Sequence, residues 1–243
     1  MKWLKIWFLV SLILLIAVKS YPQTMLKTYE LCLECCSEEI VDKVYKEKNN
    51  YLDINVIVPQ FNNLSNKKQQ DLINNKITSL TETSIDEVKS VADEYFKDRP
   101  SPLVSYQLYG RYKVTNNSDI ISFYIDYYQF TGGAHGMTTR FAYNIDKSTG
   151  KEVELKDIFK EGFEYKDIIN KEINRQISKD PDRYFSGKDG FVGISEDQSF
   201  YIKNNTLIIY FGLYEIAPYA SGISEFIIPN NLLEENFKYD KIK

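Results

Sequence analysis

The stretch Asp126-Tyr-Tyr-Gln-Phe-Thr-Gly-Gly-Ala-His-Gly-Met-Thr-Thr-Arg-Phe-Ala-Tyr143 holds the sole histidine of the chain, His135. Three glycines, Gly132, Gly133 and Gly136, fall within five positions of it, which indicates backbone that needs positive φ or close packing. Aromatic residues alternate with polar ones on both sides of the glycines, as in half-buried strands. The stretch therefore predicts two strands of a sheet joined by a glycine-rich turn.

The segments before and after this turn predict more strands and two helices. Tyr51–Pro59 alternates apolar residues on one face, and we expect Pro59 to end that strand. Apolar residues at three- and four-residue steps predict a long helix that opens at Asn66, with a weak point near Thr81–Ser84. The other predicted elements are strands at Ser37–Lys48, Leu103–Val114, Asp119–Phe130, Thr138–Ile145, Glu152–Leu155, Gln198–Lys203, Thr206–Gly212 and Ile223–Pro229, a helix at Glu164–Lys179, short helical turns from Asp157 and at Leu232–Asn236, a surface loop at Asp182–Asp197, and an irregular crossing at Glu215–Gly222.

This order of elements predicts an α+β fold, with antiparallel meander sheets and one amphipathic helix packed per half. We expect two subdomains, at residues 37–150 and 151–243, that share one core. Gly150 lies in a hairpin turn where a left-handed conformation is expected.

The N-terminal residues have the pattern of an export signal. Lys2 and Lys5 precede an apolar run from Ile6 to Val18, which is short for a membrane span and predicts a cleaved signal peptide over residues 1–20. An uncleaved N-terminal anchor is the alternative, and it is the only membrane contact that the sequence predicts.

Three cysteines, Cys32, Cys35 and Cys36, lie in the next segment, residues 21–36. A structural zinc site needs a second ligand pair, and a redox Cys-x-x-Cys needs a thioredoxin-like setting, so neither is favoured. A local disulfide is open, but we favour a flexible segment without a defined role.

The charge of the exported part limits the kinds of partner. Without Lys2, Lys5 and Lys19, 27 basic residues face 34 acidic ones, a net charge of about −7. This balance argues against binding to nucleic acid or to anionic lipid and suits a cationic partner. Solubility alone would also account for it.

Two sets of motifs lie along the chain. The first set is Val58-Pro59, Ile73-Asn-Asn-Lys-Ile77 and Tyr128-x-Phe-Thr-Gly-Gly-Ala-His-Gly136; the second is Leu155-x-Asp-Ile-Phe159, Phe200-Tyr201 and Tyr214-Glu-Ile-Ala-Pro-Tyr-Ala-Ser-Gly222. The first set resembles the N-terminal domain of PdaC-type peptidoglycan deacetylases, and the second resembles the extracytoplasmic half of the anti-sigma-V factor (RsiV) family.

The resemblance implies a sensor-like domain, since the extracytoplasmic half of the anti-sigma-V factor is a lysozyme receptor. Only five residues precede the apolar run, so we expect the sensor half exported alone, without a segment that holds a sigma factor. One histidine cannot supply the metal site of a deacetylase. We therefore predict no metal, no cofactor and no enzymatic activity.

His135 has a structural and a chemical interpretation. A catalytic histidine needs a nucleophile and an orienting group, and the chain has no Gly-x-Ser-x-Gly elbow. We favour a role in which His135 forms hydrogen bonds that hold the glycine turn. The glycines favour a tight strand connection over a backbone nest for an anion.

The 19 tyrosines and 14 phenylalanines say more about a binding function than His135 or the glycines do. About half should pack a core, and those at the motif ends could form a sugar-stacking platform or a protein contact. Glu215 is expected to satisfy backbone donors, or else to meet a cationic partner. The candidate ligand-binding residues are Tyr128, Phe130, Thr131, Gly132, Gly133, His135, Gly136, Tyr214, Glu215 and Tyr219.

These observations favour a non-catalytic, extracytoplasmic binding module of the bacterial cell envelope, either secreted or tethered to the membrane. The candidate ligand, by resemblance, is a lysozyme-type muramidase. A peptidoglycan- or glycan-binding accessory domain is the alternative, and an envelope hydrolase that uses His135 is the third hypothesis.

Overall fold

The computed structural model describes residues 40–98 and 104–240. The predicted signal segment and the cluster of Cys32, Cys35 and Cys36 lie outside the described residues. No helix within the described ranges combines the length and apolarity that a bilayer crossing requires.

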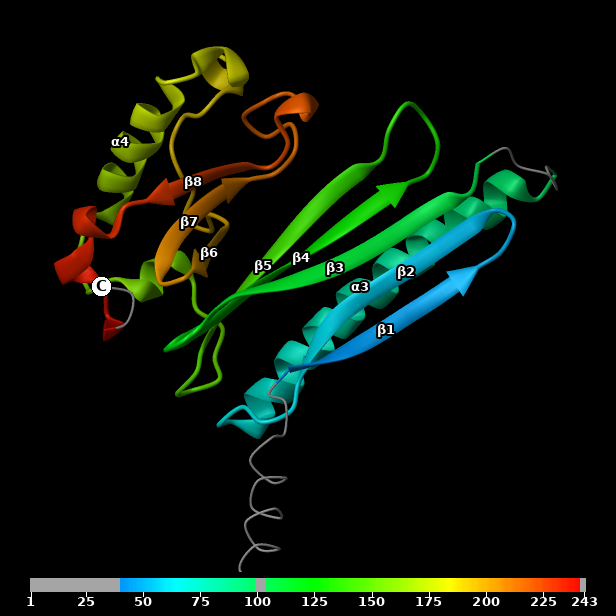
Figure 1. Cartoon of the computed structure of the whole chain (residues 1–243), viewed down its shortest axis with the longest axis horizontal. Coiled ribbons are helices and arrows are strands. Elements are labelled where there is room, and N and C mark those ends of the chain that lie inside the picture. The colour runs from blue at the N-terminus through cyan, green and yellow to red at the C-terminus, as the bar shows by residue number, and fades with distance from the viewer. Residues whose placement is uncertain (1–39, 99–103, 241–243) are drawn as a thin grey trace, which may run out of the picture. The chain divides into compact units, whose positions relative to one another are not determined.

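The first half of the described chain is a five-stranded sheet with one long helix on one face (Figure 1). The strands lie in sequence order across the sheet. They are β1 (Ile40–Lys48), β2 (Leu52–Phe61), β3 (Tyr106–Asn117), β4 (Ile120–Phe130) and β5 (Met137–Asp146), and the helix is α3 (Lys67–Phe96).

The pairing of β2 with β3 differs from the expected antiparallel meander. These two strands are parallel, with Leu52 opposite Tyr106 and Val56 opposite Gly110. The reason is the helix between them, because α3 carries the chain back to the end of the sheet where β2 began. The other strand pairs of this sheet are antiparallel.

The prediction that Pro59 ends its strand is wrong, since β2 continues to Phe61. The Phe61 N–H donates to Oδ1 of Asn74 on α3, at 2.8 Å, so this side of the strand faces away from β1. Alternate residues of a strand direct their backbone groups to the same side. The nitrogen of Pro59 therefore points to the side of β2 where β3 lies. Pairing of β2 with β3 ends at Val56, so no strand N–H is needed at Pro59.

Helix α3 begins where the sequence predicts, but the expected weak point does not break it. The Asn66 side chain caps the helix by accepting from the Gln69 N–H at 3.2 Å. The Thr81 hydroxyl lies 2.8 Å from the Ile77 carbonyl oxygen and 2.6 Å from the Tyr127 hydroxyl on β4. This buried contact joins helix to sheet, and burial raises the pKa of Tyr127 to about 12.

The second half contains a three-stranded antiparallel sheet and one helix, joined by loops. Its predicted strand at Glu152–Leu155 is wrong, because only the single bridge between Ile145 and Glu152 forms and Leu155 already starts a helical turn. Gly150 has the expected left-handed φ of 71°. The elements are the 3₁₀ turn Leu155–Ile158, α4 (Tyr165–Ile177), β6 (Phe200–Lys203), β7 (Thr206–Phe211) and β8 (Ser224–Ile228).

Each half has its own hydrophobic cluster. Ile54, Val56 and Phe123 pack with α3 in the first half, and Ile173, Ile209 and Phe226 pack with α4 in the second. The fold class is α+β, as the sequence predicts. The subdomain boundary between residues 150 and 151 stays a prediction.

A polar seam joins the two sheets. The Ser122 hydroxyl on β4 donates to Oδ1 of Asn144 on β5, at 2.7 Å, and accepts from the Ile202 N–H on β6, at 2.8 Å. Asn144 Nδ2 in turn donates to the Phe200 carbonyl oxygen at 3.0 Å. All these groups are buried, so the bonds hold β6 against β4 and β5.

Candidate functional site

Two segments far apart in the sequence meet at the turn between β4 and β5. The His135 ring stacks on the Tyr219 ring, with centroids 3.9 Å apart and planes at 22°. The Tyr219 hydroxyl donates to the Gly136 carbonyl oxygen at 3.0 Å, across 83 positions of the sequence. The Tyr214 ring lies 5.8 Å from that of Tyr219. The structure thus brings three of the candidate side chains into one cluster.

Hydrogen bonds orient the His135 ring. Nδ1 lies 3.0 Å from the Gly136 carbonyl oxygen, which can only accept, so Nδ1 carries the proton in this contact. In the neutral ring, Nε2 is then an acceptor, and the Tyr214 hydroxyl lies 3.5 Å from it. Both contacts lie within the turn and the crossing, which agrees with the predicted structural role of the histidine.

Gly136 lets the turn close onto a strand. A Cβ at this position would lie 2.4 Å from the Tyr128 ring and 2.6 Å from the Gln129 carbonyl oxygen, closer than packed atoms approach. Tyr128 therefore packs directly over Gly136. We call Tyr128, His135, Tyr214 and Tyr219 the aromatic surface.

The remaining candidates lie around this surface in different settings. Gly132 and Gly133 are exposed and adopt left-handed φ of 98° and 89°. Phe130 and Thr131 are half-buried at the end of β4 and the start of the turn. Glu215 accepts from the Gly212 N–H at 2.7 Å, which matches its predicted role toward backbone donors.

A hollow of about 690 Å³ borders the aromatic surface on the side of Tyr214 and Glu215. Phe185, Phe191 and Val192 line it, and Val192 is 80% exposed. These residues belong to the predicted surface loop, and sequence reasoning did not select them. The adjacent apolar pairs Tyr184-Phe185 and Phe191-Val192 in a glycine-rich loop were the available signal.

A partly buried group of charged side chains fixes β5 to the second sheet. The Arg140 guanidinium makes two 2.7 Å bonds to Asp126 on β4 and also contacts Glu225 on β8. It lies 3.7 Å above the Tyr124 ring centroid. Burial alone would lower the pKa of Arg140, but the hydrogen bonds and charge of Asp126 raise it above its ordinary value. We call Arg140, Asp126, Glu225 and Tyr124 the arginine joint.

The groups that contact His135 in the described structure are a backbone carbonyl and two tyrosine side chains. They are the Gly136 carbonyl and the rings of Tyr214 and Tyr219. Among the described residues, no three side chains of His, Cys, Asp or Glu gather as metal ligands would. The predicted absence of a metal and of catalysis stays a prediction.

Comparisons with known proteins divide the chain along the same two sets of motifs. Residues 45–138 match the family model described as deacetylase PdaC, and residues 156–231 match the protein family of unknown function DUF3298. The chain joins a PdaC-type region to a DUF3298-type region. The resemblance that the motifs indicate is confirmed.

Two relatives from Bacillus subtilis (strain 168) are similar in sequence to this chain. The anti-sigma-V factor RsiV is 29% identical over 196 residues, which is 77% of this chain and 66% of RsiV. The peptidoglycan-N-acetylmuramic acid deacetylase PdaC is 28% identical over 156 residues, 63% of this chain and 32% of that enzyme. The chain is therefore similar to an anti-sigma factor, and it spans just under two thirds of one relative and a third of the other.

Solved structures of DUF3298 proteins share the fold. A member from Bacteroides fragilis superposes with a TM-score of 0.62 at 20% identity, covering 84% of this chain and 97% of its own. A second DUF3298 protein, from Pseudomonas aeruginosa, has a TM-score of 0.54 at 19% identity. The match covers 84% of this chain and 94% of that protein. At these identities the likeness concerns the α+β architecture.

Proposed function

We propose that this chain is a non-catalytic, extracytoplasmic binding module of the bacterial cell envelope. Its ligand is a lysozyme-type muramidase, and the aromatic surface makes the contact. The observation that carries the proposal is the stack of His135 on Tyr219, which joins the two family motifs at an exposed site. Similarity to an anti-sigma-V factor supports the location and the sensor-like role.

The aromatic surface has the properties of a protein-binding hot spot. Tyr214 is 48% exposed and has a left-handed backbone, with φ of 65°, that holds its ring away from the core. Tyrosine rings give large contact areas and lose little conformational entropy on binding. The hydrogen bond from Tyr219 to Gly136 and the stack on His135 fix the rings in advance, which lowers the entropic cost of association.

The charge of the chain suits a basic partner. The whole sequence carries a formal charge of −4 at pH 7. Opposite charge on the partner speeds encounter and adds a contribution that salt screens. Binding should therefore weaken as the salt concentration rises.

The contacts of His135 favour recognition over turnover. Its Nδ1 is committed to the Gly136 carbonyl, and the group near Nε2 is a tyrosine hydroxyl at 3.5 Å. A histidine base would have to reach a nucleophile from Nε2 while a carboxylate or carbonyl oriented Nδ1. Among the described residues, His135 has the orienting contact at Nδ1, and the group near Nε2 is the Tyr214 hydroxyl.

A titration with lysozyme tests the proposal. We expect a dissociation constant in the micromolar range at about 50 mM salt and weaker binding at about 500 mM. Tyr214→Ala should weaken binding at least about tenfold, because the exposed ring is lost.

Tyr95→Ala is the matched control. Tyr95 lies on α3 and is 47% exposed, almost the same as Tyr214, but it lies on the helix side of the first sheet. Its loss should leave the affinity unchanged. Absence of binding by the wild-type chain at high micromolar lysozyme would reject the proposed ligand, and equal effects of the two variants would reject the proposed surface.

A further inference from the structure

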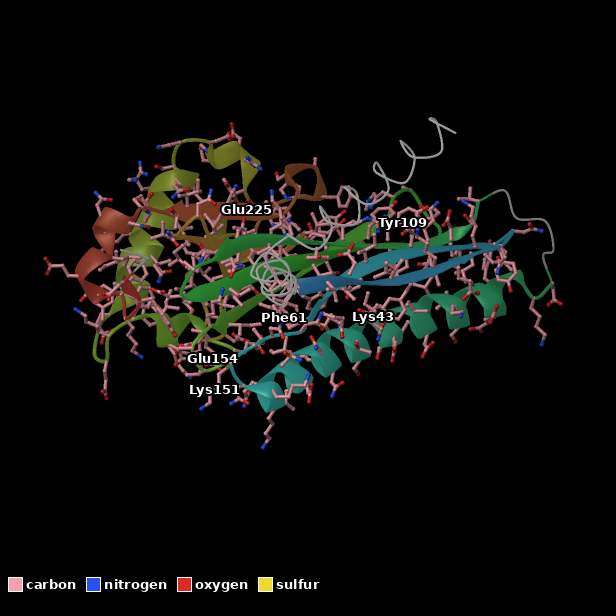
Figure 2. All side chains as sticks on the ribbon, turned by 60° about the horizontal axis from the view of Figure 1, so that its bottom comes forward. Lys43, Phe61, Tyr109, Lys151, Glu154 and Glu225 are labelled. Atoms are coloured by element: carbon pink, nitrogen blue, oxygen red, sulfur yellow. The ribbon has the colours of Figure 1, made fainter. Side chains whose placement is uncertain are left out.

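A second hollow lies on the five-stranded sheet, on the face opposite α3. Its volume is about 550 Å³. Figure 2 shows Tyr109 on the side of the sheet that faces away from α3, whereas Lys43 points toward the helix. The polar and aromatic side chains that line it are Lys46, Lys48, Asp53, Asn55, Tyr109 and Arg111. The Glu47 side chain instead forms an ion pair with Lys89 on α3.

The register of the strands explains why these side chains converge. Asn55 on β2 lies opposite Lys46 on β1 and opposite Tyr109 on β3. Asp53, two residues earlier on β2, lies opposite Lys48. Residues two apart on a strand share a face, and Ile54 between them is buried on the core side. The hollow is therefore a built feature of three neighbouring strands.

The Tyr109 ring forms one wall of the hollow. Tyr109 pairs across the strands with Tyr128, and their rings stack with centroids 6.2 Å apart and planes at 16°. Tyr128, which belongs to the aromatic surface, packs over Gly136 and therefore lies between this hollow and the turn that carries His135. A flat ring beside hydrogen-bonding groups accommodates the C–H face of a sugar, which is apolar while its edge carries hydroxyls.

The polar groups in the hollow are held in place. Arg111 Nη1 donates to the backbone carbonyl oxygens of Asn55, at 2.8 Å, and Gly110, at 2.6 Å. Lys48 forms an ion pair with Asp53 at 2.5 Å. These contacts fix a guanidinium, an ammonium and a carboxylate around the tyrosine ring.

Asn55 has an unmet hydrogen-bonding requirement. Its Oδ1 is buried and finds no donor among the residues that the structure describes. A buried polar atom without a partner is costly and calls for an explanation. A hydroxyl of a ligand that enters the hollow as the side chain rotates would supply the missing donor.

The charges distinguish between classes of ligand. Lys46, Lys48 and Arg111 outnumber the acidic groups of the hollow, although the chain as a whole is acidic. Two acceptors, Asp53 and Asn55, lie among these cations. Such a mixture suits a ligand that offers both hydroxyl donors and a carboxylate, whereas a phosphodiester chain would place acceptors against the two acceptors.

We propose that this hollow, on the face of the sheet opposite α3, binds a carboxylate-bearing oligosaccharide. The sugar ring packs on Tyr109, its hydroxyls donate to Asp53 and Asn55, and its carboxylate meets Arg111 and Lys46. This site goes beyond the proposed lysozyme contact and involves other residues, so either one can fail without the other.

The proposal can be tested with two probes, of which only one carries carboxylates. One is a tetrasaccharide of alternating N-acetylglucosamine and N-acetylmuramic acid, and the other is chitotetraose, which lacks the lactyl carboxylates. Calorimetry on the full chain should show the acidic probe binding at least about tenfold more tightly, because the cations contribute only to that ligand.

Variants locate the site. Tyr109→Leu should weaken the acidic probe at least about tenfold, and Arg111→Ala should remove its advantage over chitotetraose. Lys113→Ala, which removes an exposed cation two residues further along β3, is the matched control and should change neither affinity. Tyr214→Ala should leave sugar binding intact, which separates this result from the lysozyme contact.

A wild-type measurement makes the test independent of variant folding. In an NMR titration, the acidic probe should shift the Tyr109 ring and the Asn55 side-chain amide. The proposal is overturned by absence of binding at about 5 mM probe, by equal affinity for both probes, by shifts confined to other residues, or by tighter binding of single-stranded DNA than of the acidic sugar.

Discussion

The arginine joint and the aromatic surface are close in sequence, since Arg140 lies on β5 and His135 lies in the turn just before it. Their aromatic and charged side chains are nevertheless used in different ways. At the joint, the Arg140 side chain is 9% exposed and is enclosed by Asp126, Glu225 and Tyr124. At the surface, His135 and Tyr214 are exposed, and both of their rings lie beside the Tyr219 ring. The side chains of the arginine joint bond to one another within the protein, whereas the aromatic surface exposes ring faces that a partner could contact.

This difference shows that residue type alone does not assign a role to the aromatic residues of this chain. Tyr124 and Tyr210 flank Arg140 and complete the contact between the sheets. Tyr214, only a few positions after Tyr210, has left the end of β7 and faces solvent. Whether a ring packs or binds depends on where its strand ends.

The largest expected effect is at the joint. Arg140→Met should lower the free energy of unfolding by about 3 kcal/mol, because it leaves Asp126 and Glu225 without their cation at a partly buried site. Urea denaturation measures it, and Lys113→Met is the control that removes an exposed cation. A loss below about 0.5 kcal/mol would mean that the joint is no more important than a surface ion pair.

A smaller effect is expected where the turn meets the strand. Gly136→Ala places a methyl group against the Tyr128 ring and the Gln129 carbonyl, and should cost about 2 kcal/mol of stability while disturbing the aromatic surface. Gly133→Ala is the contrasting variant, since its added Cβ would touch nothing within 4 Å and only its φ of 89° opposes it. It should cost about 1 kcal/mol. Equal costs with unchanged lysozyme binding would contradict the packing described for Gly136.

The smallest effect concerns an ion pair on α4, where Arg175 is half exposed, in contrast to Arg140. Hydrogen bonds from Arg175 lower the pKa of the Glu172 carboxyl below its ordinary value. The stabilisation is therefore present above the ordinary carboxyl pKa and is lost as the pH falls through the lower pKa of the folded state. Unfolding measured from pH 6 to pH 3 should show a weaker pH dependence in Glu172→Gln, by less than about 1 kcal/mol. An unchanged pH profile would show that the pair contributes nothing.

Local features of the fold were predictable from the sequence, and its long-range pairings were not. The Asn66 cap and the left-handed Gly150 follow from residue type and immediate neighbours. The parallel pairing of β2 with β3 depends on where α3 returns the chain, and the strand that includes Pro59 depends on where β3 stops pairing. Neither is written in a local pattern.

The candidate site divides in the same way. The motifs identified His135, Tyr214 and Tyr219 as candidates, but the contact between residues some 80 positions apart arises only from the packing of the two halves. The sequence did not identify Phe185, Phe191 and Val192 as candidates, because their segment has the composition of a solvent-exposed loop. Their position beside Tyr214 is a tertiary property.

Hydrogen–deuterium exchange of the full chain, with and without lysozyme, tests the central claim most directly. The claim is that two separate segments form one contact surface. Slower exchange on binding should appear together in residues 131–137 and 213–222, with α3 unaffected. Slower exchange in only one of these segments, or chiefly along α3, would contradict the account.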